Sequence, residues 1–429
     1  MNEKFNNSRI SLPAAVSIGI GGMIGAGIFS ILGVVSEASG TAMWISFLIG
    51  GVIALFSTYS YAKLGAKFPT AGGAVEFLVR GWGKGLMSGG INLFMWIGYV
   101  IAIALYAQGF SAYCATFFTQ NPSPLLLKSL ASGIVILFTG VNVLGAGSVG
   151  RAEVFIVGVK VSILILFAVS GLFFIKPENL SPALWNDIPD IFFGAGVLFI
   201  GYEGFGLVTN AAGNMNNPQK MLPKALYISV FIVILIYLAV SITVTGNLSI
   251  SQIYSSRDFA LAEAAKPFLG NTGFKLIAIA ALFSTASAIN ATLFGGANVS
   301  YMIARDGQLP EFFSRKEWKG ATGGLLVTAF LVIVFILFFN LSGIAMMGSG
   351  AFLLIYAAVN AGHLKIIEQT GAKKSIVIVS IILCLIMFAI LEIYTFKNSA
   401  EAVWTMLVLL LLSFAGEKIF EKYRVKQGN

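Results

Sequence analysis

The sequence has little charge and almost no histidine or cysteine. Of its 429 residues, 10% are charged, one is histidine, two are cysteine and 57% are hydrophobic. A soluble protein carries about 25% charged residues. One histidine and two separated cysteines provide no metal-ligand cluster, no nucleophile–histidine pair and no disulfide framework. These absences argue against an enzyme, and we expect no cofactor and no metal.

Long apolar runs are what the chain has instead. Each run is about 20 residues long, enough to cross a hydrocarbon layer about 30 Å thick. Membrane β-barrels would show alternating segments of about 10 residues. The sequence therefore predicts an all-α polytopic protein of the lipid bilayer, with twelve spans at about 11–39, 42–66, 87–118, 126–146, 150–176, 187–212, 223–246, 270–304, 323–340, 344–366, 375–395 and 399–418.

Positive charges are unevenly distributed over the loops between these spans. With the N-terminus in the cytoplasm, 20 of the 27 lysines and arginines fall in inner segments, and 6 fall in outer ones: Lys128, Lys176, Arg257, Lys266, Lys275 and Lys397. Cytoplasmic loops of membrane proteins carry such an excess. The distribution predicts a multi-pass protein of the cell (cytoplasmic) membrane with both termini cytoplasmic. It also accounts for the net charge of +9 without a nucleic acid partner.

Two connecting segments are expected to be helical in part. The inner loop 67–86 mixes aromatic residues, glycines and charges, which predicts an interfacial half-helix. The outer loop 247–269 carries a helical stretch, Phe259 to Phe268, that would lie across the outer mouth.

Two glycine-rich stretches interrupt spans at corresponding positions. They are 21–29 (GGMIGAGIF) in the first span and 199–206 (FIGYEGFG) in the sixth. Glycine weakens a helix by about 1 kcal/mol relative to alanine. Backbone groups freed at membrane depth are tolerated only where they are buried in protein or line a cavity. Breaks five helices apart are what an inverted five-plus-five repeat predicts.

Such a pair of breaks would suit a zwitterion. The N–H groups at the start of a half-helix carry partial positive charge and can hold a carboxylate. Freed carbonyl groups at the ends of the preceding half-helices can hold an ammonium group, and an α-amino acid has both. The alternative is structural, because small residues also let helices pack closely in membranes.

Lys160 lies near the middle of the fifth span with no polar neighbour on its own helix. A charge there costs about 2.5–3.5 kcal/mol on insertion scales. A membrane lysine that can be charged or neutral is a natural proton carrier. The alternative is a structural lysine that is permanently hydrogen-bonded to backbone carbonyls.

Two further groups of polar residues lie within spans. Glu203, in the second break, would bind or titrate, or else would cap freed N–H groups. The eighth span carries Ser284, Thr285 and Ser287. Their hydroxyls would bond carbonyls of their own helix, or would ligate a small cation or the lysine ammonium.

Four stretches together resemble the amino acid–polyamine–organocation (APC) superfamily of transporters, in particular its proton-coupled amino acid transporters. They are GGMIGAGIFS at 21–30, FIGYEGFG with the following NNPQKMLPKA at 199–225, ALAEAAKPFLGNTGF at 260–274 and GGANVSYMIARDGQLPEFF at 295–313. The resemblance implies a single transport domain with the LeuT-like fold. Its inverted repeats would be 11–176 and 187–366, with two additional helices in 375–418.

The resemblance also implies residue roles. The substrate carboxylate would bind N–H groups of Gly25, Ala26 and Gly27, and its amino group would bind carbonyls of Met23 or Ile24 and of Ile200, Gly201 and Glu203. Lys160 would take the place of a sodium ion and reach the Gly21 carbonyl and Ser284. We also expect the pocket to be bordered by Tyr99, Ala102, Tyr202 and Phe205, with Ser287 nearby.

The function that these features predict is proton-coupled symport of amino acids by alternating access. An exchanger of the same fold and a non-transporting amino acid sensor are the alternatives. Glu203 departs from the proton-coupled pattern, in which that position is apolar. Its carboxylate would favour a cationic amino acid or bind the coupling proton itself.

Overall fold

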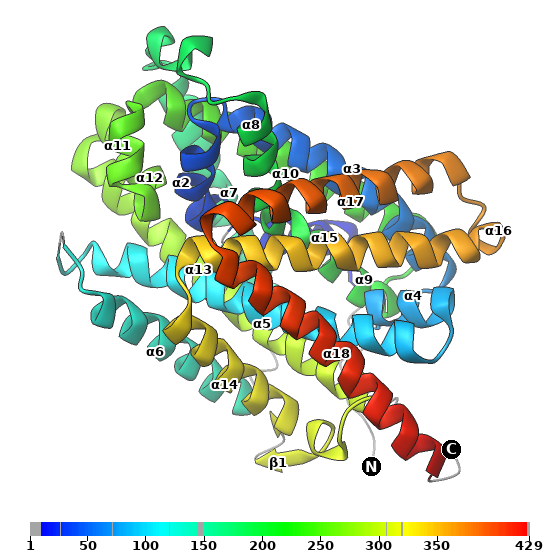
Figure 1. Cartoon of the computed structure of the whole chain (residues 1–429). Coiled ribbons are helices and arrows are strands. Elements are labelled where there is room, and N and C mark those ends of the chain that lie inside the picture. The colour runs from blue at the N-terminus through cyan, green and yellow to red at the C-terminus, as the bar shows by residue number, and fades with distance from the viewer. Residues whose placement is uncertain are drawn as a thin grey trace.

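The computed structural model describes residues 10–25, 27–70, 72–119, 121–144, 149–305, 307–318 and 321–426. This part of the chain is almost entirely helical (Figure 1), which confirms the expected all-α polytopic class. Eleven helices in it are long and apolar enough to span a membrane. A twelfth apolar helix, α14 (Gly323–Phe338), has 16 residues. At 1.5 Å per residue it is about 24 Å long, and it lies where the ninth span was expected.

The other spanning segments follow the expected order. They are α1 (Leu12–Met23) with α2 (Gly27–Ser39), α3 (Met43–Lys67), α5 (Leu86–Ala115), α6 (Pro124–Val143), α7 (Val149–Leu172), α8 (Ile188–Val197) with η3 (Leu198–Gly206) and α9 (Leu207–Asn210), α10 (Pro218–Asn247), α13 (Lys266–Arg305), α15 (Leu341–Lys365), α17 (Lys374–Asn398) and α18 (Ala400–Lys426).

Several spans begin at a side-chain N-cap, which fixes their bounds. Ser11, Ser123, Asn217 and Asn340 each accept a hydrogen bond from a backbone N–H of the following first turn. This satisfies one of the N–H groups that a helix start leaves unpaired. The seventh span was expected to start at residue 223. It starts at Pro218 instead, because Asn217 caps it there and Pro218 is tolerated in the first turn.

Short elements connect the spans. They are α4 (Gly73–Trp82), α11 (Ile250–Ser255), α12 (Ala260–Glu263) and α16 (Ile367–Thr370), the 3₁₀ turns η1 (Pro177–Leu180), η2 (Pro182–Leu184), η4 (Ala212–Asn214), η5 (Arg257–Phe259) and η6 (Glu311–Phe313), and the antiparallel strands β1 (Lys316–Trp318) and β2 (Ala321–Thr322). The helix expected in 67–86 is α4. The stretch expected from Phe259 to Phe268 is helical, but it is divided between η5, α12 and the start of α13.

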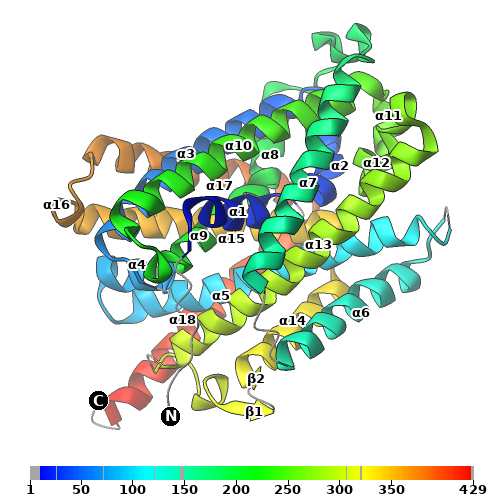
Figure 2. The same ribbon diagram turned by 180° about the vertical axis from the view of Figure 1, so that it is seen from behind.

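The half-helix α1 lies in the middle of the bundle (Figure 2). It packs against α7 and α10 and crosses η3. The last turns of α18 and the strand β1 lie at one end of the bundle, which we call the termini end, whereas α11 and α12 lie at the opposite, far end (Figure 1). The division into repeats 11–176 and 187–366 with two additional helices in 375–418 stays a prediction.

Candidate functional site

The first predicted break is present. Helix α1 ends at Met23, and the N–H of Ile24 makes the last helical bond, to the Ile20 carbonyl. Helix α2 begins at Gly27. Ile24 and Gly25 form a turn between them, and Ala26 lies outside the described residues. The chain therefore changes from one half-helix to another within a few residues, in the middle of the bundle.

The second predicted break takes the form of a 3₁₀-helix. The nine residues Leu198–Gly206 form η3, which lies between α8 and α9. Such helices seldom exceed four residues, and inside a longer helix they often mark a functional hinge. Ser349 of α15 supports the start of η3: it accepts a hydrogen bond from the Ile200 N–H at 2.9 Å and donates one to the Val197 carbonyl at 2.6 Å. Nothing in the sequence around Ser349 indicated this role.

Where the two breaks cross, glycines of one segment lie against glycines of the other. A Cβ at Gly204 would fall on the backbone of Gly22, and a Cβ at Gly201 would lie 3.1 Å from Cα of Gly27. Gly201 comes before Gly204 in the second break but lies against Gly27, which comes after Gly22 in the first. The two segments therefore run antiparallel. The glycines therefore do allow close packing, as the structural alternative proposed, and they do so at the breaks themselves.

Hydroxyl groups hold the carbonyls of both breaks. The Tyr237 hydroxyl, from α10, lies 2.6 Å from the Met23 carbonyl oxygen and 3.0 Å from that of Gly201. Ser284 of α13 donates to the Ile24 carbonyl at 2.6 Å. Tyr356 of α15 donates to the Glu203 carbonyl at 2.7 Å. A carbonyl oxygen has two lone pairs, so each retains capacity for a second donor. Nothing in the sequence around Tyr237 indicated this bridge.

Lys160 is bound to the first break. Its side chain is buried, with 2% exposed. Its Nζ donates to the Gly21 carbonyl oxygen at 3.1 Å, which is the contact that the resemblance implied. Helix α7 thereby joins α1, and Ser284 joins α13 to the same break. A direct contact between Lys160 and Ser284 stays a prediction, as does any role of the half-buried Ser287.

Glu203 is also buried, with 2% exposed, and it faces a pocket. Its Oε1 accepts a hydrogen bond from the Tyr106 hydroxyl at 3.1 Å. The pocket lies toward the termini end of the bundle and is lined by Glu203, Tyr61, Gly72, Ala74, Val75, Met95, Tyr99, Gly206, Asn210, Val299, Phe352, Ile355 and Tyr356. Tyr99, one of the expected pocket neighbours, is among them.

Comparison with known proteins decides the family. A family model described as amino acid permease matches residues 10–414. The chain belongs to the amino acid permease family. This permease is 41% identical over 419 residues to the uncharacterised protein MJ0609 of Methanocaldococcus jannaschii, covering 97% of this chain and 95% of that one.

Two further relatives carry names that state a transport role. The permease is 33% identical over 417 residues to the inner membrane transport protein YbaT of Escherichia coli, covering 96% of each chain. It is 25% identical over 402 residues to the branched-chain amino acid permease BcaP of Lactococcus lactis, covering 86% and 84%. The family and these two relatives are transporters and not enzymes.

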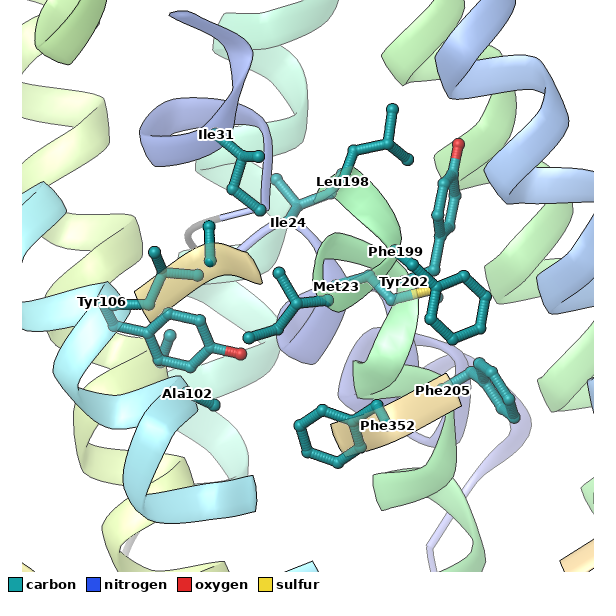
Figure 3. Close-up of a cluster of buried hydrophobic side chains, with 14 of the residues drawn as sticks. Met23, Ile24, Ile31, Ala102, Tyr106, Leu198, Phe199, Tyr202, Phe205 and Phe352 are labelled. Carbon is teal, nitrogen blue, oxygen red and sulfur yellow. The ribbon is translucent and has the colours of Figure 1, made fainter. Parts of the chain in front are cut away.

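The interior of the permease between α5 and the breaks is filled by apolar side chains. Figure 3 shows Ala102 and Tyr106 from α5 and Ile24 from the first break in this cluster. Tyr202 lies on the opposite side of η3, and its hydroxyl donates to the Phe47 carbonyl at 2.8 Å. Phe205 packs edge-on against Tyr61. Neither Tyr202 nor Phe205 lines the Glu203 pocket, and their binding roles stay predictions.

At the far end of the permease, η5 packs against α2. A Cβ at Gly33 of α2 would fall on the backbone of Arg257. Arg257 also forms an ion pair with Glu37 at 2.8 Å, and this hydrogen bond raises the pKa of the guanidinium. Burial raises the pKa of the adjacent Asp258, against the opposing effect of Arg257. The contact between Gly33 and Arg257 and the Arg257–Glu37 pair therefore join η5 to α2 at the far end.

Proposed function

We propose that this permease is a proton-coupled symporter that carries amino acids across the cytoplasmic membrane by alternating access. The amino acid substrate is supported by the family and by the relative named as a branched-chain amino acid permease. The excess of positive charge in the segments at the termini end supports a cytoplasmic location for that end.

The observation that carries the proposal is the contact between Lys160 and Gly21. The lysine is the charged residue of α7 that reaches a break, and it bonds the break's backbone directly. A charge-assisted hydrogen bond is about twice as strong as a neutral one. A protonated Lys160 therefore ties α7 to α1 and favours the substrate-binding state open to the outside. Loss of the proton to the cytoplasm loosens that tie and lets the substrate leave.

The substrate binds between the same two breaks. Its carboxylate binds the N–H groups at the start of α2, around Gly25 and Gly27, where the helix end carries partial positive charge. Its amino group binds the carbonyls at the end of α1 and in η3, where Met23 and Gly201 already accept the Tyr237 hydroxyl. Proton site and substrate site then share one short segment, from Gly21 to Gly27.

Uptake into proteoliposomes tests the role of Lys160. We expect an imposed inward proton gradient to drive amino acid uptake by the wild type and to have no effect on Lys160→Ala. Lys128→Ala is the matched control, because Lys128 also donates to a backbone carbonyl, that of Leu337, but at an exposed position. Uptake by Lys160→Ala that still follows the proton gradient would contradict the role.

Preloaded vesicles separate symport from exchange. A symporter fills empty vesicles when the gradient is applied. An exchanger requires internal amino acid and ignores the gradient. A protein that binds amino acids with no flux of any labelled amino acid would be a sensor.

A further inference from the structure

Glu392 is an acidic residue at membrane depth that the proposed function does not use. It lies on α17, six residues before the helix ends at Asn398. At 1.5 Å of rise per residue, this places it about 9 Å below the far end of the helix. Ionisable side chains inside membrane spans are costly and usually mark a functional site. Glu392 therefore calls for a role of its own.

The carboxyl group of Glu392 is packed at the junction of three helices. Helix α17 lies against α15 and α18 (Figure 1). A Cβ at Gly350 of α15 would lie 2.6 Å from Glu392 Oε1 and 2.7 Å from Sδ of Met406 on α18. The absence of a side chain at Gly350 therefore makes room for the carboxyl group. An α-carbon and a thioether meet it there, and neither can neutralise a negative charge.

One oxygen of this carboxyl group is buried without a partner. Glu392 Oε2 makes no hydrogen bond within the described residues, and neither does the buried Oγ1 of Thr395, one turn further along α17. Burying an ionised carboxylate without a cation is unfavourable, so such a group takes up a proton and becomes neutral. A proton on Oε2 turns it into a donor, and the Thr395 hydroxyl is an acceptor within one turn of it.

Cations do not compensate Glu392 in the described part of the chain, where the ion pairs join other side chains. The charged groups on α17 and on the helices packed against it lie toward the helix ends: Lys63, Lys67, Asp190, Lys365, Lys374, Lys397, Glu401, Glu417, Lys418, Glu421 and Lys422. The other titratable groups on these helices are Tyr59, Tyr61, Tyr356, His363, Cys384 and Tyr394.

A proton fits this site better than a metal ion does. A divalent cation such as Ca²⁺ takes about six to eight oxygen ligands. Within the described residues, no three acidic, histidine or cysteine side chains come together. A proton needs a single oxygen, and Oε2 provides it.

Helix α15 connects Glu392 to the second break. A Cβ at Gly348 would fall on the side chain of Ile200 in η3. Ser349, the next residue, accepts a hydrogen bond from the Ile200 N–H at 2.9 Å. Gly350, the residue after that, faces Glu392. Three consecutive residues of α15 thus contact η3 and α17, so a separation of α17 from α15 would also disturb η3.

We propose that Glu392 is a proton-binding site through which the pH outside acts on the second break. Its carboxylate takes one proton from the outer solution and becomes a neutral carboxylic acid, which packs between α15, α17 and α18. Loss of the proton to the same solution leaves a negative charge that draws in water. This separates α17 from α15 and weakens the hold of Ser349 on η3. The inference rests on the proposed function only for the assignment of the far end to the outside.

Infrared spectroscopy of the purified full-length protein tests the protonation state, because a carboxylic acid and a carboxylate absorb at different frequencies. Glu401→Gln is the control, since Glu401 is an exposed carboxylate at the start of α18. At neutral pH, we expect the wild type and Glu401→Gln to show a carboxylic acid band that Glu392→Gln lacks. In alkaline buffer that difference should vanish. Glu392→Met gives the same comparison with an apolar side chain. An equal acid band in the wild type and both Glu392 variants at neutral pH would overturn the proposal.

Hydrogen–deuterium exchange tests the connection to η3. The readout is the protection of the peptide that contains Ile200, relative to its intrinsic exchange rate, so that the direct effect of pH on exchange cancels. From neutral to alkaline buffer, we expect the wild type and Glu401→Gln to lose at least about 5-fold more protection than Glu392→Gln, the lower end of usual coupling between two sites. Equal losses in the wild type and Glu392→Gln would overturn the connection.

This proposal and the proposed function fail separately. Neither measurement uses an amino acid or a proton gradient, and Lys160 is unchanged in every variant. Uptake that proves independent of a proton gradient would leave the acid band of Glu392 as predicted. Conversely, a Glu392 that is ionised at neutral pH would leave proton-coupled symport through Lys160 intact.

Discussion

Gly22 of α1 and Gly204 of η3 meet backbone to backbone where the two interrupted helices cross. A Cβ on Gly204 would fall on the Gly22 carbonyl carbon, and one on Gly22 would lie 3.0 Å from Cα of Gly204. No flexible side chain stands between them to yield. The distance between the two breaks is therefore set by the absence of side chains at these two positions.

Gly204→Ala is expected to destabilise the permease by about 1–3 kcal/mol, the usual cost of overpacking. Gly206→Ala is the control in the same 3₁₀-helix. A Cβ there would lie 3.6 Å from Tyr61 Cε1, which is ordinary contact. Thermal unfolding of both variants in detergent provides the comparison. Equal melting temperatures for the two would mean that the crossing is not closely packed.

Tyr237→Phe is expected to weaken amino acid binding as well as stability. It removes the hydroxyl that lies between the Met23 and Gly201 carbonyls, at a cost of about 1–3 kcal/mol for buried groups left unpaired. Tyr202→Phe loses one bond, to the Phe47 carbonyl, away from the breaks. We expect Tyr202→Phe to lower the melting temperature and to affect amino acid affinity less than Tyr237→Phe does. The reverse pattern would place the substrate nearer to Tyr202.

Packing, more than charge, is expected to hold η5 over the far end. The Arg257–Glu37 pair is about half exposed, and such pairs contribute about 0–1 kcal/mol. Gly33→Ala drives a methyl group into the Arg257 backbone, so it must displace η5, whereas Arg257→Gln leaves η5 in place.

A second pocket lies at the far end and is lined by Glu37 of α2 and Ser342 of α15, among others. Labelling of a Ser342→Cys variant measures this difference in a background without Cys114 and Cys384. A membrane-impermeant maleimide should react faster in Gly33→Ala than in the parent protein, and at an unchanged rate in Arg257→Gln. Acceleration in Arg257→Gln alone would assign the closure to the ion pair.

The spans and both breaks were predictable because their signals are local. Runs of apolar residues and clusters of glycine lie within a few positions of one another, whereas the start of the seventh span at Pro218, which Asn217 caps, was missed. The contact between Lys160 and Gly21 was predictable for another reason. It followed from the resemblance to the superfamily, since nothing near Lys160 in sequence names its partner.

The groups that hold the breaks together were not predictable. Tyr237 and Ser349 lie in ordinary apolar spans, and their roles arise only when α10 and α15 pack against η3. The form of the second break was missed for a similar reason. Three glycines in 199–206 suggest an interruption, but whether the backbone opens or tightens into a 3₁₀-helix depends on the bonds that Ser349 and its neighbours provide.

The proposed symport mechanism requires that the proton of Lys160 moves with the substrate. The direct measurement is acidification inside proteoliposomes, followed with a trapped pH-sensitive dye, when amino acid is added outside with no imposed gradient. The wild type and Lys128→Ala should acidify the interior, and Lys160→Ala should not, even where it still takes up amino acid. Acidification by Lys160→Ala at the wild-type ratio of protons to amino acid would contradict the claim.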